Sequence, residues 1–226
     1  MGITYGTSTL FQATKGIVQD GLVLNLDAGV DKSYPRNGTT WYDLAGSNNG
    51  TLTNGPTFDR GNGGNIVLDG SNDAIRISDL TFSSAGFTYS FAAKFNSSQS
   101  TSFPRIIAGG AEIEWHMSGP HKLRWRWVGG SPSALDSNSN YFIQDAIHVY
   151  TITYTSPNLT LYRDGSLFQT MTYTSSSDTA FNTFMNRSSY NRPLGGNVYQ
   201  CLLYNRTLTS TEVLQNYNVI KTRLGL

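Results

Sequence analysis

The C-terminal segment places the strongest constraint on what this chain can fold into. Residues 198–204 (Val-Tyr-Gln-Cys-Leu-Leu-Tyr) are apolar on both faces, which predicts a strand at the centre of a sheet. The segment Thr209-Ser210-Thr211-Glu212 then has the spacing of a capping box, in which the first and last residues bond each other's backbone N–H groups. A lone terminal helix joined to a buried strand is expected to lie on the edge or face of a β-sandwich.

This helix carries an apolar stripe through which it should pack. Val213, Leu214, Tyr217 and Ile220 recur at helical spacing, and Leu208 precedes the cap where a hydrophobic staple would place it. If the stripe is core, truncation of Leu214 to Ala is expected to cost ~2–5 kcal/mol of unfolding free energy. The expected role of the helix is structural.

The composition excludes several classes of protein. The 226 residues suffice for one large all-β domain, and 16 basic against 15 acidic residues leave no basic excess for a nucleic-acid partner. No apolar run approaches the length that spans a membrane. The one cysteine, Cys201, excludes an internal disulfide framework and is expected to be a small buried hydrophobe in the last strand.

The N-terminal segment lacks the features of a secretory signal, because residues 1–16 hold one lysine and no apolar core. Residues 1–20 are expected to form an N-terminal arm and residues 21–226 the domain, which should fold without the arm. The arm contains Tyr5, Leu10 and Phe11, so it is either a loose tail or a segment that orders on a neighbouring subunit.

Alternation of apolar and polar residues predicts strands along most of the remaining chain. In residues 87–95 every odd position is apolar, so that face should be deep core, and Asp164-Gly165 predicts a tight hairpin. Residues 31–64 and 174–196 are expected to be polar loops. Further strands are expected at 22–27, 65–68, 74–78, 104–108, 112–117, 122–128, 146–155, 159–163 and 166–173. The pattern predicts an all-β fold, a two-sheet antiparallel β-sandwich or jelly roll with one C-terminal α-helix.

Several separated motifs, in order along the chain, resemble one family. They are Gly-Leu-Val-Leu-Asn-Leu-Asp-Ala-Gly at 21–29, Ser-Tyr-Pro at 33–35, Thr-Thr-Trp-Tyr-Asp-Leu at 39–44, Asn-Gly-Thr-Leu at 49–52, Asn-Gly-Pro-Thr-Phe at 54–58, Asp-Gly-Ser-Asn-Asp at 69–73, Asp-Gly at 164–165 and Tyr-Asn-Arg-Thr-Leu-Thr at 204–209. Together they resemble the concanavalin A-like, laminin-G-type jelly-roll domains of bacteriophage virion structural proteins, notably those of marine and cyanobacterial phages. The resemblance covers residues 21–226.

This resemblance implies a non-enzymatic virion structural protein, a surface-exposed decoration or fibre-type module with glycan adhesion as a further role. It implies display on a particle and release by host lysis in place of secretion. We also expect many copies on a particle or a homo-oligomer, with contacts to other virion proteins through the apolar residues of the arm. The alternative is a lectin-like adhesin that binds host or environmental glycan. A glycan hydrolase of the same fold is the third reading.

Hydrolases with this jelly roll carry carboxylates at alternate positions of one strand, which aims them into one cleft. The nearest match is Glu112-Ile113-Glu114-Trp115-His116, whose third position is a histidine. We therefore expect no catalytic residues and a half-exposed strand with its polar side chains outward.

Residues 123–127 (Leu-Arg-Trp-Arg-Trp) are the most suggestive surface. Trp125 and Trp127 share one face, and Arg124 and Arg126 share the other. If the tryptophan face is open, it could stack on sugar rings beside Trp115 or His116. If that face is core, the two arginines become the exposed feature and could contact a capsid or an acidic glycan.

The spacing of residues indicates no metal site or other cofactor. His116, His121 and His148 lack the spacing of metal ligands. Asp69, Asn72 and Asp73 could offer oxygen ligands to calcium, but the same residues are the usual formers of a tight turn, and the turn is the favoured reading.

Overall fold

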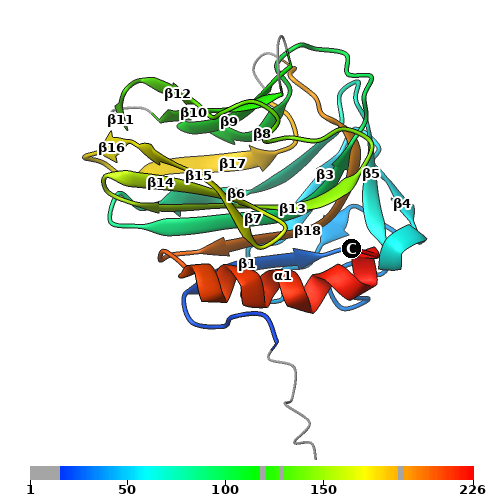
Figure 1. Cartoon of the computed structure of the whole chain (residues 1–226). Coiled ribbons are helices and arrows are strands. Elements are labelled where there is room, and N and C mark those ends of the chain that lie inside the picture. The colour runs from blue at the N-terminus through cyan, green and yellow to red at the C-terminus, as the bar shows by residue number, and fades with distance from the viewer. Residues whose placement is uncertain (1–15, 118–120, 128–129, 188–190) are drawn as a thin grey trace, which may run out of the picture.

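Two large antiparallel sheets face each other and one α-helix lies against the outer side of one of them (Figure 1). The structure is a computed structural model that describes residues 16–117, 121–127, 130–187 and 191–226. The first sheet has the order β15-β14-β13-β7-β18-β5-β4, with β1 also paired to β18. The second has the order β12-β10-β9-β8-β17-β6-β3-β2, and β11 pairs with β16 apart from both. The predicted sandwich with a C-terminal helix is confirmed.

The elements have the following bounds: β1 Leu22–Asp27, β2 Thr40–Trp41, β3 Gly50–Thr53, β4 Thr57–Asp59, the 3-10 turn η1 Gly61–Gly63, β5 Asn65–Asp69, β6 Ala74–Phe82, β7 Phe87–Phe95, β8 Arg105–Gly109, β9 Ala111–His116, β10 Lys122–Trp127, β11 Gly130–Ser131, β12 Ala134–Asp136, β13 Ile147–Thr155, β14 Asn158–Arg163, β15 Ser166–Thr172, β16 Thr174–Ser175, β17 Thr179–Phe184, β18 Gly195–Tyr204 and α1 Ser210–Leu224.

Strand β18 is the central strand of the first sheet, as its sequence predicts. It pairs with β7 on one side, and with β5 and then β1 on the other. All of its residues except Asn197 are buried. Cys201 lies in this strand, and burial raises the pKa of its thiol to about 12. The thiol is therefore protonated near neutral pH, and Cys201 is the small buried hydrophobe that the sequence predicts.

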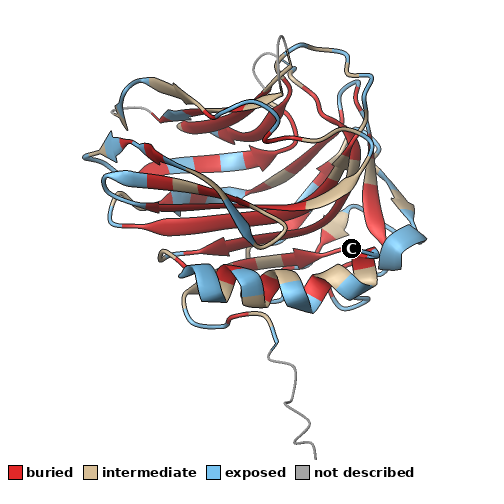
Figure 2. Ribbon diagram, viewed as in Figure 1, coloured by how far each residue is buried: buried red, intermediate tan, exposed pale blue. Residues whose placement is uncertain are grey.

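Much of each strand in the two facing sheets is buried (Figure 2), and many of the residues in the core between the sheets are aromatic. The odd positions of β7 are all buried there, which confirms the prediction for residues 87–95. The ring of Phe87 lies 5.7 Å from that of Trp125, and the ring of Phe95 lies 5.2 Å from that of Trp115, so each pair joins the two sheets. Burial of such rings supplies most of the apolar driving force for the fold.

The predicted loops contain strands that the sequence does not reveal. Residues 31–64 include the short strands β2, β3 and β4, and residues 174–196 include β17. Strand β17 pairs with both β6 and β8, with a register shift between Phe181 and Thr183. This bulge sends Phe181 and Phe184, three positions apart, into the same core, so the usual period of two is broken. The expectation of loops was wrong in both segments: β17 was hidden by its bulge, and β2, β3 and β4 have only two to four residues each, too few to show a period.

Helix α1 confirms the predicted N-terminus but not the whole predicted stripe. The Thr209 hydroxyl accepts from the Glu212 N–H, and Glu212 accepts from the Thr209 N–H, which completes the capping box. Leu208 and Val213 are buried in one cluster, as a hydrophobic staple requires. Leu214, however, is 45% exposed, and its expected burial was wrong. The helix instead buries one polar and three apolar residues: Val213, Asn216, Ile220 and Leu224.

Asn216 takes the place of an apolar residue because it binds the N-terminal segment. Its Oδ1 accepts from the Val18 N–H at 2.9 Å, and its Nδ2 donates to the Tyr204 hydroxyl at 2.9 Å. That hydroxyl donates to the Val18 carbonyl at 3.0 Å. Val18 is buried between α1 and β18, so the domain continues a few residues before Gly21. Residues 1–15 of the expected arm lie outside the described residues.

Within the part of the chain that the structure describes, no helix is long and apolar enough to cross a membrane.

The position of the helix predicts unequal costs for two truncations. Ile220→Ala should lower the unfolding free energy by ~2–5 kcal/mol, because this side chain is buried against the first sheet. Leu214→Ala should change it by less than ~0.5 kcal/mol, because the side chain is largely in solvent. Urea denaturation of both variants measures the difference. Equal costs would mean that the helix is rotated from its position here.

The helix cap predicts a pH dependence. The bidentate ion pair with Arg206 and the Thr209 N–H lower the pKa of Glu212 from 4.5 to about 2. A lowered folded-state pKa gives stability that is complete above the unfolded pKa and is lost as the pH falls through the folded one. Glu212→Gln should therefore be less stable than wild type by about 1 kcal/mol at pH 7.

This difference should shrink between pH 4.5 and pH 2 and vanish below that range. Urea denaturation of both proteins across this range is the measurement. A difference that stays constant with pH would show that the Glu212 charge does not carry the cap.

Candidate functional site

Strands β9 and β10 present a charged outer face on the second sheet. The alternation of a strand sends Ala111, Ile113 and Trp115 of β9 inward and leaves Glu112 and Glu114 on the outer side. In β10, inward Leu123, Trp125 and Trp127 alternate with outward Lys122, Arg124 and Arg126. The sequence predicts this division of faces, although not which face is core.

The tryptophan face is core. Trp115 and Trp125 have no exposed surface, and Trp127 is 2% exposed. Their rings pack on aromatic residues of the first sheet, including Phe87 and Phe95. Of the two alternatives that the sequence leaves open, the buried face is the one observed, so Trp115, Trp125 and Trp127 cannot stack on sugars as the glycan-binding alternative expected.

A cluster of ion pairs covers the outer face of β8, β9 and β10. The Arg105 guanidinium lies between two carboxylates, with Nη2 3.0 Å from Glu114 Oε1 and Nε 3.4 Å from Glu112 Oε2. Arg126 Nε is 2.7 Å from Glu114 Oε1, and Arg187 Nη1 is 3.0 Å from Glu112 Oε1. We call these five side chains the charge cluster. Arg105, Glu112 and Glu114 are buried, whereas the arginines 126 and 187 reach solvent.

Burial is the largest influence on the Arg105 guanidinium. It lowers the pKa of Arg105, and the nearby guanidiniums of Arg187 and Arg192 lower that pKa further, while Glu114 and Glu112 raise it. Buried charges are tolerated in a protein only when opposite charges compensate them. Glu112 and Glu114 are therefore needed to keep Arg105 in place, and this ties both carboxylates to a structural task.

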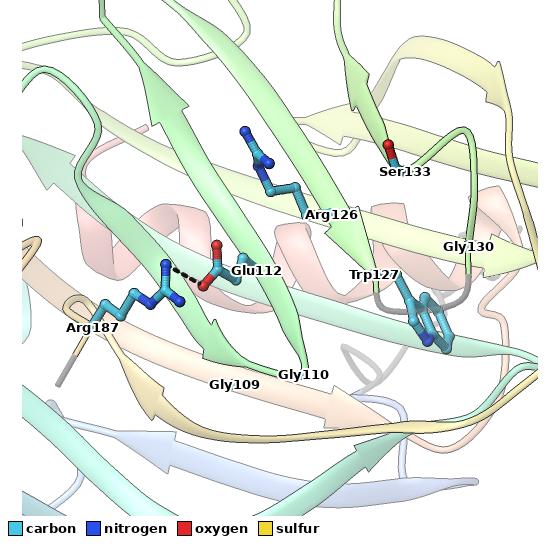
Figure 3. A pocket seen from close by; sticks show the side chains of 8 residues that line it. All are labelled: Gly109, Gly110, Glu112, Arg126, Trp127, Gly130, Ser133 and Arg187. Atoms are coloured by element: carbon cyan, nitrogen blue, oxygen red, sulfur yellow. Dashed lines mark ion pairs between the residues drawn. The ribbon is translucent and has the colours of Figure 1, made fainter. Parts of the chain in front are cut away.

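The charge cluster borders a pocket of about 430 Å³. Figure 3 shows Glu112 and Arg187 facing each other across an ion pair, with Arg126 on the neighbouring strand and Ser133 beyond it. The described residues that line the pocket are Gly109, Gly110, Glu112, Arg126, Trp127, Gly130, Ser133 and Arg187.

The glycines of this lining are required by packing. A Cβ on Gly110 would lie 2.2 Å from Thr179 Oγ1, and one on Gly109 would lie 2.5 Å from the Cα atom of Phe181. Both contacts are with β17, so the close approach of this strand requires glycine at the two positions. This part of the pocket is therefore lined by the backbone atoms of the two glycines, next to the charged side chains.

Two predicted site residues, Arg124 and His116, do not line the pocket. Arg124 makes a bidentate pair with Asp136 at 2.6 and 2.7 Å, and hydrogen bonding within the pair lowers the pKa of Asp136 and raises that of Arg124. His116 Nδ1 lies 4.0 Å from the same carboxylate, and its ring lies 4.9 Å from that of Phe103. Of the predicted residues with outward side chains, the structure brings Arg126 to the pocket, and it adds Glu112.

The expected calcium candidates form a bonded turn. Asp73 Oδ2 accepts from the Asp69 N–H at 2.9 Å, and Asp69 Oδ1 accepts from the Ser71 N–H at 2.7 Å. The Asn72 carbonyl accepts from the Asn54 side chain. In the described residues, no group of three or more His, Cys, Asp or Glu side chains is placed to hold a metal ion. The tight turn that the sequence favours is thus formed by these residues.

Sequence reasoning missed Arg105 and Arg187. A signal for Arg105 is present, because a single charge opens the apolar run Ile106-Ile107-Ala108 and such a charge in a strand needs a partner opposite it. Arg187 follows β17, and only the three-dimensional path of the chain brings it to Glu112. No pattern in the sequence indicates that contact.

Comparisons with known proteins agree with this architecture. A family model described as the concanavalin A-like lectin/glucanases superfamily matches residues 69–214. A search of the curated proteins found no match.

Among solved structures, domain 4 of AbnA, an extracellular GH43 arabinanase from Geobacillus stearothermophilus in complex with arabinotriose, has a TM-score of 0.66 at 16% identity and covers 87% of this chain and 98% of that one. The binding domain of Paraclostridial Mosquitocidal Protein 1 has a TM-score of 0.65 at 21% identity, with 88% and 52% covered. A Trypanosoma rangeli sialidase mutant with trans-sialidase activity has a TM-score of 0.62 at 14% identity, with 91% of this chain covered. The chain spans about a third (34%) of the length of that sialidase.

The charge cluster predicts a large difference between two arginine variants. Arg105→Gln should lower the unfolding free energy by about 3 kcal/mol, because it removes the buried charge that Glu112 and Glu114 share. Arg126→Gln should lower it by no more than ~1 kcal/mol, since that side chain is 45% exposed. Urea denaturation tests both, and a neutral Arg105→Gln would contradict the structural role of the cluster.

Proposed function

This chain belongs to the concanavalin A-like lectin/glucanase superfamily, and on that basis we propose that it is a non-enzymatic carbohydrate-binding domain. The pocket beside the charge cluster is the proposed binding site. The observation that carries the proposal is a hollow of about 430 Å³ on the outer face of β8, β9 and β10, bordered by two solvent-reaching arginines and a carboxylate.

The chemistry of the lining supports sugar as the ligand class. A guanidinium presents several N–H donors in one plane and a carboxylate accepts several hydrogen bonds, which suits the neighbouring hydroxyls of a sugar ring. The Ser133 hydroxyl adds a group that can donate or accept. The volume lies in the range of small-molecule sites, which run from about 300 to 1,000 Å³.

A solved neighbour also motivates this proposal. Domain 4 of the arabinanase was solved with arabinotriose, and this chain covers 98% of that domain. At 16% identity the likeness concerns the fold alone, so it supplies the class of ligand to test and no binding residue.

The state of the two carboxylates supports a non-enzymatic role. A glycoside hydrolase needs one carboxyl group to donate a proton and a second to act as nucleophile or base, both within reach of the glycosidic bond. Glu114 is 2% exposed and lies within 3.0 Å of Arg105 and 2.7 Å of Arg126. Glu112 is held between Arg105 and Arg187, and the third position of the strand is His116.

A glycan array together with a digestion assay tests the proposal. We expect the full chain to bind a subset of the glycans on the array. In the digestion assay we expect it to release no reducing ends from any of them. Glu114→Gln should leave the digestion result unchanged. Release of reducing ends by wild type that Glu114→Gln abolishes would overturn the non-enzymatic reading, and the absence of any bound glycan would overturn carbohydrate binding.

We further propose display on a bacteriophage virion, as a surface decoration or fibre-type module in many copies, released by lysis. Its support is the ordered series of motifs from residue 21 onward. One geometric feature favours this arrangement. Residues 16–20 meet the domain on the side of α1 (Figure 1), whereas the pocket is lined by residues of the second sheet, among them Glu112 of β9 and Arg126 of β10. An arm bound to other virion proteins would therefore leave the pocket facing outward.

Two truncations and mass spectrometry of purified particles test this second proposal. A chain that starts at Gly16 should keep the melting temperature of the full chain, because Val18 and its bonds to Asn216 and Tyr204 remain. It should nevertheless fail to enter particles. A chain that starts at Gly21 should also melt at a lower temperature. Absence of the full chain from purified particles would overturn the virion role.

A further inference from the structure

The charge cluster holds an excess of positive charge next to the pocket. Arg105, Arg126 and Arg187 oppose Glu112 and Glu114, so three guanidiniums face two carboxylates. A fourth guanidinium, that of Arg192, acts on Arg105 through space. Arg192 donates to the Thr101 hydroxyl, which is a neutral acceptor and leaves its charge in place. The surroundings of the pocket are therefore electropositive in a chain whose overall charge is almost balanced.

From this excess we infer that the pocket selects sugars that carry an anionic group, a carboxylate or a sulfate, over neutral sugars. The inference rests on the carbohydrate-binding function proposed above and adds the class of ligand. An anion at the pocket supplies the negative charge that the cluster lacks, and a charge-assisted hydrogen bond is about twice as strong as a neutral one.

The exposed guanidinium excess lies at the pocket end of strands β9 and β10. Toward the other end, Arg124 and Asp136 compensate each other through two hydrogen bonds. At the pocket, Arg126 is 45% exposed and its closest carboxylate contact uses only Nε. A guanidinium has five N–H donors, so one ion pair leaves Arg126 with donors for a ligand.

The Glu112 carboxylate, which also lines the pocket, does not exclude an anion. It lies 3.0 Å from Arg187 and 3.4 Å from Arg105, so its negative charge is compensated by two guanidiniums. It is buried, and an anion at the pocket would meet the more exposed guanidiniums of Arg126 and Arg187.

Neutral sugars lack a comparable source of affinity at this pocket. Their apolar ring faces gain most by packing on an exposed aromatic ring, because such a ring offers a large rigid apolar surface. The aromatic residue among the described lining is Trp127, and its side chain is buried in the core. A neutral sugar would then be held by hydrogen bonds alone. Each of these bonds replaces a bond to water, so its net contribution to affinity is small.

Matched pairs of oligosaccharides test the inference on the full wild-type chain. Each pair holds an anionic sugar and its neutral counterpart with the same linkage: galacturonate and galactose, glucuronate and glucose, mannuronate and mannose, and sulfated and unsulfated galactose. We expect binding by the anionic member of at least one pair at least about tenfold tighter than its neutral counterpart, with affinity falling as salt rises. The pairs also separate carboxylate from sulfate as the anionic group.

Two variants with the same change in net charge then assign the preference to the pocket. Arg126→Gln should reduce it about tenfold or more. Arg60→Gln, an exposed arginine beside η1 and remote from β9 and β10, should leave it unchanged. Thermal unfolding confirms that both variants fold. Equal losses in the two variants would show general electrostatic attraction and would overturn the assignment to the pocket.

The wild-type pairs decide the inference without any variant. Neutral members that bind as tightly as anionic ones would overturn the anionic preference and leave carbohydrate binding intact. Failure of every member of every pair, and of the wider array, would remove the proposed function on which the inference depends.

Discussion

The pairing of β18 on both of its edges is the constraint on which the rest of the structure depends. Strand β7 takes one edge, while β5 and β1 divide the other between them. Segments from the beginning, the middle and the end of the chain thus meet on one strand. Because backbone groups along a buried strand must find partners, the complete first sheet requires the C-terminal segment.

Much of the sandwich could be predicted because its strands are long and regular. Residues 87–95 alternate without a break, and the double apolar face of 198–204 correctly indicates a central strand. Strand β17 could not be predicted in the same way, because its bulge places Phe181 and Phe184 in one core at a spacing that mimics a helix. The helix shows a related limit. Apolar Leu214 is exposed and polar Asn216 is buried, because Asn216 bonds the backbone of Val18, which is distant in sequence.

Only part of the candidate site could be predicted from the sequence, since Arg126 was among the expected residues whereas Arg105 and Arg187 were not. Alternation in β10 correctly places arginine and tryptophan on opposite faces of the strand. Which of these faces is buried depends on the opposing sheet, where Phe87 and Phe95 pack against Trp125 and Trp115. The pairing of Arg105 with Glu114 follows from the register of β8 on β9, and Arg187 arrives from beyond β17. Contacts of this kind depend on topology rather than on local pattern.

The attachment of Val18 has a mechanical consequence. Its backbone is held by Asn216 of the helix and Tyr204 of the central strand. A pulling force applied through the N-terminal segment would therefore first load the bonds of Val18 to the Asn216 and Tyr204 side chains, before it reached β1. Among the described strands, β1 pairs with β18 alone, and a strand paired on one edge can be peeled away one hydrogen bond at a time. The bonds of Val18 must break before tension reaches that strand.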